Sequence, residues 1–228
     1  MRSRVRYAWL VKPTAALTSL KPRPEPGFDL RTRRKLQTRR ALQDAAIRLF
    51  AEYGYAETTV AEIAALAEVG ERTFFVHFPT KEDVLFFDMF ENWDEFHRLI
   101  GAAPKKLSDL STIEFALVRM HEDLEDEEML TRHTMTQLLV RASEASSVVR
   151  GKRMQYANTS AELAAEVLGR RHGEEPPSLA TSTVAELAMR TFFLCVNEWA
   201  DSEPNDMIPI VRRRFDAVRR VARDSKRI

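Results

Sequence analysis

The chain has 228 residues, of which 44% are hydrophobic, so it can bury a substantial core and is not an intrinsically disordered protein. Its one cysteine, Cys195, excludes an internal disulfide framework and fits a reducing cytoplasm. The net charge of +1 is unevenly distributed: residues 1–81 hold 15 Lys and Arg against 8 Asp and Glu (+7), and residues 82–228 hold 20 against 26 (−6). This basic excess fits phosphate binding, but alone it also fits a solvated surface.

Residues 1–30 form a basic, proline-rich segment. Its prolines prevent a helix from propagating, and it lacks the continuous apolar stretch of a signal peptide or a membrane span. We expect a disordered basic arm. Such an arm could track the minor groove of DNA, be a passive tail, or reflect a start assigned too far upstream.

Residues 31–53 predict a long helix that ends at Gly54, a natural C-terminal stop. Residues 59–78 then read as two short helices joined by a tight turn. Thr59 and Glu62 have the spacing of a capping box, and Gly70 can cap the second short helix. Its inward residues are Phe74 and Phe78, which leaves a polar outer face. This arrangement is typical of a DNA-reading helix-turn-helix.

The same region carries several short runs at once: Leu49-Phe50-Ala51-Glu52-Tyr53-Gly54-Tyr55, Thr58-Thr59-Val60-Ala61-Glu62-Ile63-Ala64 and Thr73-Phe74-Phe75-Val76-His77-Phe78-Pro79-Thr80-Lys81-Glu82. Over residues 31–85 the chain resembles the N-terminal domain of TetR-family transcriptional regulators. The resemblance implies an all-α fold with a three-helix headpiece and a C-terminal helical bundle for dimerisation and ligand binding. We therefore expect a basic arm at residues 1–30, a DNA-binding domain at 31–79 and a ligand-binding and dimerisation domain at 80–228.

Three positions depart from the family pattern. Glu68 stands where glycine is usual, so the turn needs a non-glycine residue near positive φ. Gly70 replaces a serine cap. Phe75 stands where a tyrosine commonly meets a phosphate, and phenylalanine cannot make that hydrogen bond.

The resemblance assigns DNA contacts by position. We expect Glu71, Arg72 and Thr73 to face base edges, because arginine can donate two hydrogen bonds to guanine and threonine can contact thymine or either base type. Residues expected at phosphates, which set register without reading sequence, are Thr58, Thr59, Phe75, His77, Lys81, Arg33, Arg34 and Lys35.

The pattern from residue 80 onward is helical throughout. Thr80 and Asp83 have the spacing to cap a helix that ends near Gly101. Further amphipathic helices are expected at residues 107–124, 128–141, 144–168, 179–200 and 206–223, with a loop marked by glycines and prolines between 169 and 177. The helix at 179–200 has a wider apolar surface than one intramolecular face requires, which includes Leu187 and Phe192. In the family the last two helices pair across a two-fold axis, so we expect a homodimer.

The middle helices supply apolar side chains for a ligand pocket, although for each of them a position in the ordinary core is the favoured interpretation. The residues considered are Trp93, Phe96, Phe115, Met120, Met129, Met135, Leu138 and Leu139, with His133, Gln137 and Arg141 as polar anchors.

No catalytic or metal-binding pattern occurs in the sequence. His121 and His133 lack the spacing of a helical ligand pair, and the acidic cluster at residues 122–128 lacks the turn glycine of a calcium loop. We therefore expect no enzyme activity, no metal and no cofactor. The sequence favours a cytoplasmic, sequence-specific DNA-binding regulator, a homodimeric repressor released from a palindromic operator by a small molecule. The alternatives are a ligand-independent DNA-binding regulator and, more remotely, an all-helical enzyme or scaffold.

Overall fold

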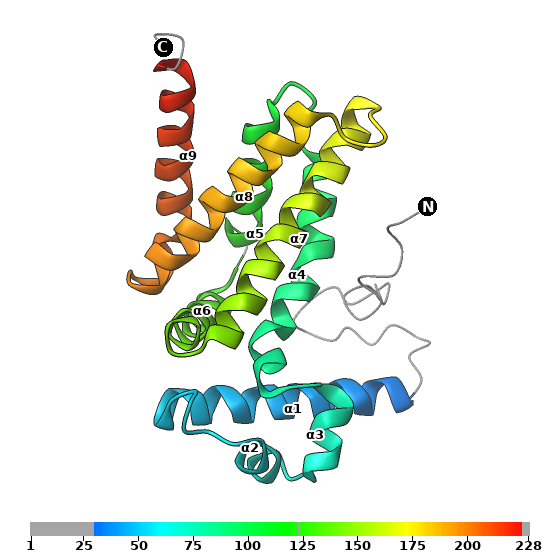
Figure 1. The fold of residues 1–228 in the computed structure, drawn as a ribbon, viewed down its shortest axis with the longest axis vertical. Coiled ribbons are helices and arrows are strands. Elements are labelled where there is room, and N and C mark those ends of the chain that lie inside the picture. The colour runs from blue at the N-terminus through cyan, green and yellow to red at the C-terminus, as the bar shows by residue number, and fades with distance from the viewer. Residues whose placement is uncertain (1–29, 123, 225–228) are drawn as a thin grey trace. The chain divides into compact units, whose positions relative to one another are not determined.

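The computed structural model describes residues 30–122 and 124–224, without the side chains of 30–32 and 87–94. Within these ranges the chain is helical and contains no strand, as the sequence predicted (Figure 1). The chain divides after Gln37, and the part before this division is described only for the first turns of helix α1 (Leu30–Tyr53). The expected basic arm at residues 1–30 lies outside the described residues, apart from Leu30.

Helices α2 (Val60–Leu66) and α3 (Glu71–His77) form the predicted helix-turn-helix. The capping box is present: the amide of Glu62 donates to the Thr59 hydroxyl, and the Glu62 carboxylate accepts from the Thr59 amide at 2.8 Å. Glu68 has φ 56°, so this non-glycine residue does adopt the left-handed conformation that the turn requires. Gly70 is the N-cap of α3 and provides no side-chain hydrogen bond.

A hydrophobic cluster holds the helix-turn-helix in place. Phe74 and Phe78 are fully buried beside Ile63 of α2 and Leu42 of α1. The same cluster includes Leu138 and its neighbours on α6 (Asp126–Ala145) and Val149 on α7 (Ser147–His172). Because this core is shared with the C-terminal helices, the headpiece residues after Thr38 do not form an isolated unit.

The C-terminal part follows the predicted helices to within about one turn at each end. Helix α7 continues through Gly169, which was expected in the loop, to His172, and the helix expected after Thr80 begins differently. Thr80 and Asp83 make the expected capping contacts, with the Thr80 amide donating to the Asp83 carboxylate at 2.9 Å, but the first turns form a 3₁₀ helix, η1 (Lys81–Phe86). The α-helical part, α4, then runs over Phe87–Ala102. A 3₁₀ turn at a helix start is common, and sequence periodicity does not distinguish it from an α turn. The elements that follow are α5 (Asp109–Glu122), α6, α7, α8 (Leu179–Ala200), the 3₁₀ turn η2 (Pro204–Asp206) and α9 (Met207–Asp224).

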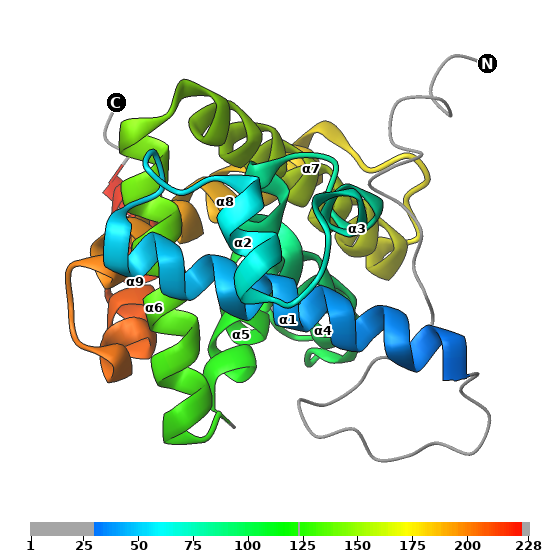
Figure 2. The same ribbon diagram turned by 90° about the horizontal axis from the view of Figure 1, so that it is seen from below.

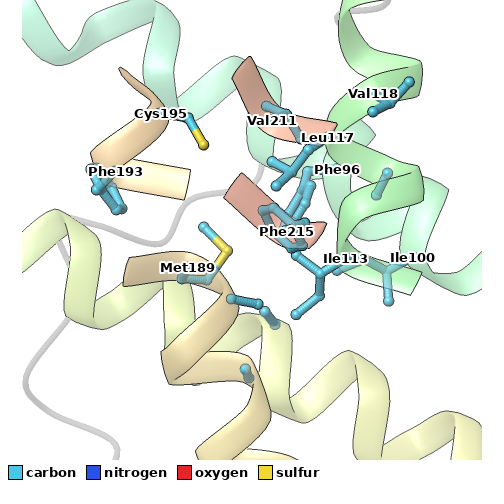
Figure 3. Packing of buried hydrophobic residues seen from close by; sticks show 14 of the residues in the cluster. Phe96, Ile100, Ile113, Leu117, Val118, Met189, Phe193, Cys195, Val211 and Phe215 are labelled. Atoms are coloured by element: carbon cyan, nitrogen blue, oxygen red, sulfur yellow. The ribbon is translucent and has the colours of Figure 1, made fainter. Parts of the chain in front are cut away.

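The second hydrophobic core lies among these helices. Figure 3 shows side chains from α4, α5, α8 and α9 gathered around Phe215, which is fully buried. Helices α7 and α8 contribute small buried residues, including Ala164, Ala185 and Ala188. Small side chains let two helix backbones approach closely, which explains the extensive α7–α8 contact.

Helix α8 has the length and composition of a membrane span, with 39% of its apolar window buried. Core helices of proteins that never enter a membrane can have the same length and apolar composition. Here α8 supplies Met189, Phe193 and Trp199 to the core, and packing accounts for their apolar character.

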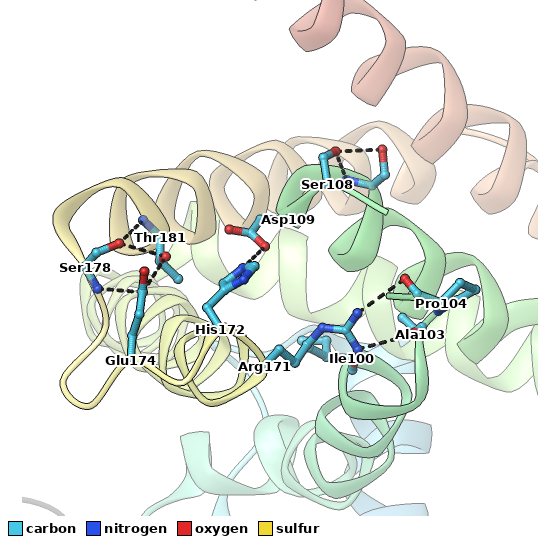
Figure 4. A network of polar contacts seen from close by, with 11 residues as sticks. Ile100, Ala103, Pro104, Ser108, Asp109, Arg171, His172, Glu174, Ser178 and Thr181 are labelled. Carbon is cyan, nitrogen blue, oxygen red and sulfur yellow. Dashed lines mark hydrogen bonds and ion pairs between the residues drawn. The ribbon is translucent and has the colours of Figure 1, made fainter. Parts of the chain in front are cut away.

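The loop between α7 and α8 is fixed by polar contacts (Figure 4). Gly173 ends α7 in the left-handed conformation, at φ 72°. Arg171 donates to carbonyls at the end of α4, including those of Ile100 at 2.9 Å and of the C-cap residue Ala103 at 3.0 Å. Glu174 accepts hydrogen bonds from Ser178 and Thr181 at the start of α8. These contacts tie the far end of the bundle together.

Candidate nucleic-acid interface and effector cavity

The outer face of α3 is exposed and formed by the residues expected there. Glu71 and Arg72 are exposed, Phe75 is 52% exposed and Val76 is 69% exposed, whereas Thr73 is half-buried. Figure 2 shows α2 and α3 beside each other on α1. Within the described residues the Arg72 guanidinium has no hydrogen bond or ion pair, so its donors are available to an external partner. An exposed arginine on a short helix whose opposite face is buried can donate two hydrogen bonds to the edge of a guanine.

The residues expected at phosphates occupy different settings. Thr59 is exposed at the start of α2, although its hydroxyl also contacts Glu62 at 2.8 Å. His77 is half-buried at the end of α3. Arg33, Arg34 and Lys35 are exposed in the first turns of α1, in the part of the chain before Gln37.

Thr58 does not present its side chain at the surface. Only 3% of the residue is exposed, and its hydroxyl donates to the Gly54 carbonyl at 2.8 Å. This burial argues against the expected contact between the Thr58 hydroxyl and a phosphate. The residue instead closes the turn between α1 and α2, a role that position in the sequence did not reveal.

Lys81 has an internal role that the sequence did not reveal either. Its ammonium group donates to the carbonyls of Tyr55 at 2.7 Å and Thr58 at 2.8 Å, and it lies 4.2 Å from the centre of the Tyr55 ring. Partial burial lowers the pKa of the Lys81 ammonium group. The Tyr55 hydroxyl donates to Glu82 at 2.5 Å. These contacts attach η1 to the loop that leads into α2.

A second set of polar contacts attaches η1 to α7. The Lys152 ammonium lies 2.7 Å from the Thr80 hydroxyl and 2.7 Å from the Asp83 carboxylate, and the side chains of Lys152 and Asp83 are only 26% and 20% exposed. Because charge-assisted hydrogen bonds are strengthened by partial burial, this contact fixes η1 more firmly than an exposed ion pair would.

The C-terminal helices form a partly open cavity of about 160 Å³. Its wall is mainly aromatic and aliphatic, with a few polar side chains, and comes from η1, α4, α5, α6, α7, α8 and α9: Leu85, Phe96, Leu117, Met120, His121, Thr131, Arg132, Met135, Thr136, Leu139, Tyr156, Phe192, Phe193, Val196, Trp199 and Met207. A concave, mainly apolar space with a few polar groups is the usual form of a small-molecule site.

The sequence located this wall only in part. Of the apolar residues considered, Phe96, Met120, Met135 and Leu139 line the cavity. Phe115, Met129 and Leu138 do not, and the side chain of Trp93 lies outside the described residues. The polar anchors were wrong for this cavity: His133 contacts the Trp199 carbonyl at 3.0 Å, Gln137 donates to the Ala200 carbonyl at 2.9 Å, and Arg141 is exposed.

Much of the remaining wall comes from α8, which the sequence assigned to dimerisation. Phe192, which was expected on the wide apolar surface of this helix, is half-buried and lines the cavity. Leu187 and Leu194, at 47% and 45% exposed, are the apolar residues of α8 that remain at the surface beyond its first turn. A periodic apolar pattern does not distinguish residues that face the core from residues that face a partner, so the sequence assigned both kinds in α8 to one surface.

His121 is the polar residue of the cavity that is most deeply buried, at 7% exposed. Its Nδ1 lies 2.8 Å from the Leu117 carbonyl, which can only accept, so Nδ1 carries the proton. Burial lowers the pKa of His121 to about 4, so the ring is neutral at pH 7 and Nε2 is an acceptor. The ring meets the Trp199 indole edge to face, with centroids 6.0 Å apart.

Comparison with known proteins identifies the family of this chain. The family model described as bacterial regulatory proteins of the tetR family matches residues 42–86, and the one described as the MftR C-terminal domain matches residues 110–223, half of the chain. The chain belongs to the TetR family. It is a DNA-binding transcriptional regulator, and the resemblance found in residues 31–85 is confirmed.

Individual relatives agree with this membership. The HTH-type transcriptional regulator TcmR of Streptomyces glaucescens is 48% identical over 58 residues, which span 25% of this chain and 26% of TcmR. A protein assigned as the mycofactocin biosynthesis transcriptional regulator MftR of Mycobacterium tuberculosis is 23% identical over 82% of this chain and 91% of its own. The TetR-family repressor FadR of Thermus thermophilus, solved in complex with lauroyl-CoA, has 21% identity and a TM-score of 0.53 over 78% of this chain and 91% of its own. The structural likeness supports the fold.

Within the described residues, no group of three or more His, Cys, Asp or Glu side chains is arranged to hold a metal ion. His121 and His133, whose spacing in the sequence does not fit a helical ligand pair, both lie against Trp199. A ring nitrogen of each histidine contacts a backbone carbonyl. Members of the TetR family are generally not enzymes.

Proposed function

We propose that this regulator is a homodimeric, cytoplasmic repressor that binds a palindromic operator and releases it when a small molecule occupies the cavity among its C-terminal helices. The observation that carries the proposal is the exposed face of α3, where Arg72 has no intramolecular partner among the described residues and Phe74 and Phe78 anchor the opposite face. A second headpiece about one helical turn of DNA away would read the other half-site.

The proposed DNA contacts divide into two kinds. Arg72, Thr73 and Glu71 contact base edges, with the arginine donating to a guanine. Thr59, His77, Lys81 and the basic residues Arg33, Arg34 and Lys35 contact phosphates and set the register. Lys81 keeps one N–H beyond the two that donate to backbone carbonyls, and this third donor can reach a phosphate while the other two hold the start of α2 in place.

Dimerisation is proposed through α8 and α9. Leu187 and Leu194 are separated by seven residues, two turns, and so lie on one face of α8. Val221, near the end of α9, is 67% exposed. Apolar side chains at this spacing pack well against a second copy of the same helix.

The proposed release of DNA depends on η1 and α7, which line the cavity and also hold the helix-turn-helix in place. Leu85 lines the cavity and lies on η1, which Lys81 attaches to the start of α2 and Lys152 attaches to α7. Tyr156 also lines the cavity and lies one helical turn after Lys152 on α7. A ligand that moves Leu85 or Tyr156 therefore acts on the element that holds the helix-turn-helix. It releases DNA if it favours an arrangement in which the two headpieces no longer match successive grooves.

The cavity favours this ligand-responsive interpretation over the ligand-independent one. The structurally similar FadR was solved in complex with lauroyl-CoA, which supports the proposal that this regulator also binds a small molecule. The enzyme or scaffold interpretation leaves the free face of α3 unexplained.

The decisive experiment is the selection of duplex DNA by the purified full-length protein, followed by footprinting of the DNA beside its own gene. We expect a palindrome, and we expect Arg72→Ala to weaken operator binding by about 1–3 kcal/mol with relaxed preference at one base pair in each half-site. Arg170→Ala is the matched control, because Arg170 is an exposed arginine at the far end of α7. Equal losses on operator and scrambled duplexes would contradict base reading by Arg72.

A further inference from the structure

The polar groups of the cavity differ in whether they already have partners. Arg132 is paired with Glu128 at 2.8 Å, the Thr131 hydroxyl donates to the Glu127 carbonyl at 2.9 Å, and the Trp199 indole N–H donates to the Pro204 carbonyl at 2.9 Å. Nε2 of His121 has no hydrogen-bond partner within the described ranges. The His121 side chain lines the cavity, so this nitrogen is available to a ligand group.

The state of His121 decides which group it can bind. Since Nδ1 donates to the Leu117 carbonyl, Nε2 of the neutral ring can accept but cannot donate. The Thr136 hydroxyl in the same wall can act either way and does not select between ligands. His121 therefore selects for a ligand that carries a hydrogen-bond donor.

The size of the cavity limits the rest of the ligand. A volume of about 160 Å³ is close to that of engineered apolar cavities, about 150 Å³, that hold one benzene molecule. Drug-sized ligands need larger pockets of about 300 Å³ or more. The walls are rich in aromatic side chains, including Phe96, Phe193 and Trp199, which pack well against a ring.

The charges around the cavity favour an uncharged ligand. Arg132 is the positively charged residue of the wall, and its partner Glu128 neutralises it. A carboxylate entering the cavity would lose its hydration without gaining an unpaired cation, which is unfavourable.

We propose that the effector is a neutral, single-ring compound with one hydroxyl group, of the phenol class, whose hydroxyl donates to Nε2 of His121 while its ring packs against Trp199 and Phe193. This inference rests on the proposed function, because it assigns the chemistry of the ligand that occupies the cavity. It makes His121 the residue that determines ligand specificity.

The test measures binding of four probes to the full-length protein by calorimetry: phenol, toluene, benzoate and lauroyl-CoA. Phenol and toluene have nearly the same size and differ in the donor, so we expect phenol to bind about 3- to 10-fold more tightly, the ratio expected for one hydrogen bond. Benzoate should bind more weakly than phenol. In His121→Phe, toluene should still bind and the preference for phenol should disappear.

Three results would overturn the inference: toluene binding as tightly as phenol to the unsubstituted protein, benzoate binding more tightly than phenol, or lauroyl-CoA binding where phenol does not. The first comparison uses the natural chain, so it holds even if His121→Phe does not fold. Operator titration of the ligand-free protein tests the proposed function separately. Operator binding without phenol binding removes only the ligand class, whereas phenol binding that leaves operator affinity unchanged removes the proposed release mechanism.

Discussion

The contact between Lys152 and η1 gives a quantitative prediction about how the headpiece is held. In Lys152→Met the methylene chain is largely kept, but the ammonium that lies 2.7 Å from both the Thr80 hydroxyl and the Asp83 carboxylate is lost. Asp83 keeps the donors of Thr80, at 2.8 and 2.9 Å, so its charge is not left wholly unpaired. A charge-assisted hydrogen bond contributes about 1.5–3 kcal/mol, and the remaining exposure of the pair places the expected loss near the lower end, about 1–2 kcal/mol of unfolding free energy.

The measurement is urea denaturation of the natural protein, Lys152→Met, Asp83→Asn and the double variant, read as a double-mutant cycle. We expect a coupling energy of about 1 kcal/mol between the two positions, because both single variants break the same contact. Lys106→Met is the matched control, since Lys106 is exposed and should change stability by less than about 0.5 kcal/mol. Coupling below about 0.3 kcal/mol, with Lys152→Met no different from the control, would refute the claim that this contact fixes η1 to α7.

Three further outcomes are expected. Leu187→Glu should place a carboxylate in the proposed α8 interface and give monomers in light scattering with much weaker operator binding. Val148→Glu, at a comparably exposed position of α7, should leave the dimer intact, and a dimeric Leu187→Glu would place the interface elsewhere. Phe75→Tyr should tighten operator binding by about 0.5–1.5 kcal/mol in titrations, because Phe75 is 52% exposed and a hydroxyl there can meet a phosphate; a large loss of affinity would contradict this docking. Burial lowers the pKa of His121 to about 4 from an unfolded value near 6.5, so the unfolded state binds more protons between these values and the unfolding free energy falls as pH decreases through that window. Between pH 7 and 5 the natural protein should lose about 2 kcal/mol more than His121→Gln in urea titrations. Equal losses would contradict a buried neutral His121.

Several features of the site could be predicted from the sequence because they depend on neighbouring residues. The capping box at Thr59, the left-handed Glu68 and the outward face of α3 are set by side chains within a few positions of one another. The positions of Thr58 and Lys81 could not be predicted in this way. The Lys81 ammonium contacts the carbonyl of Tyr55, 26 residues earlier, and such partners are defined only once the chain is folded.

The sequence by itself determined the helical class, the helix-turn-helix and most helix boundaries, because helical periodicity, caps and glycine stops act over one or two turns. Only the tertiary structure decided which apolar face of α8 lines a cavity and which is exposed, since Phe192 and Leu187 carry the same signal in a periodic pattern. The tertiary structure alone also brought His121 of α5 beside Trp199 of α8, 78 positions apart, in the wall of the cavity. Packing of distant helices sets burial, and burial sets the charge and hydrogen-bonding state of a side chain, so the chemistry of the cavity is a property of the fold.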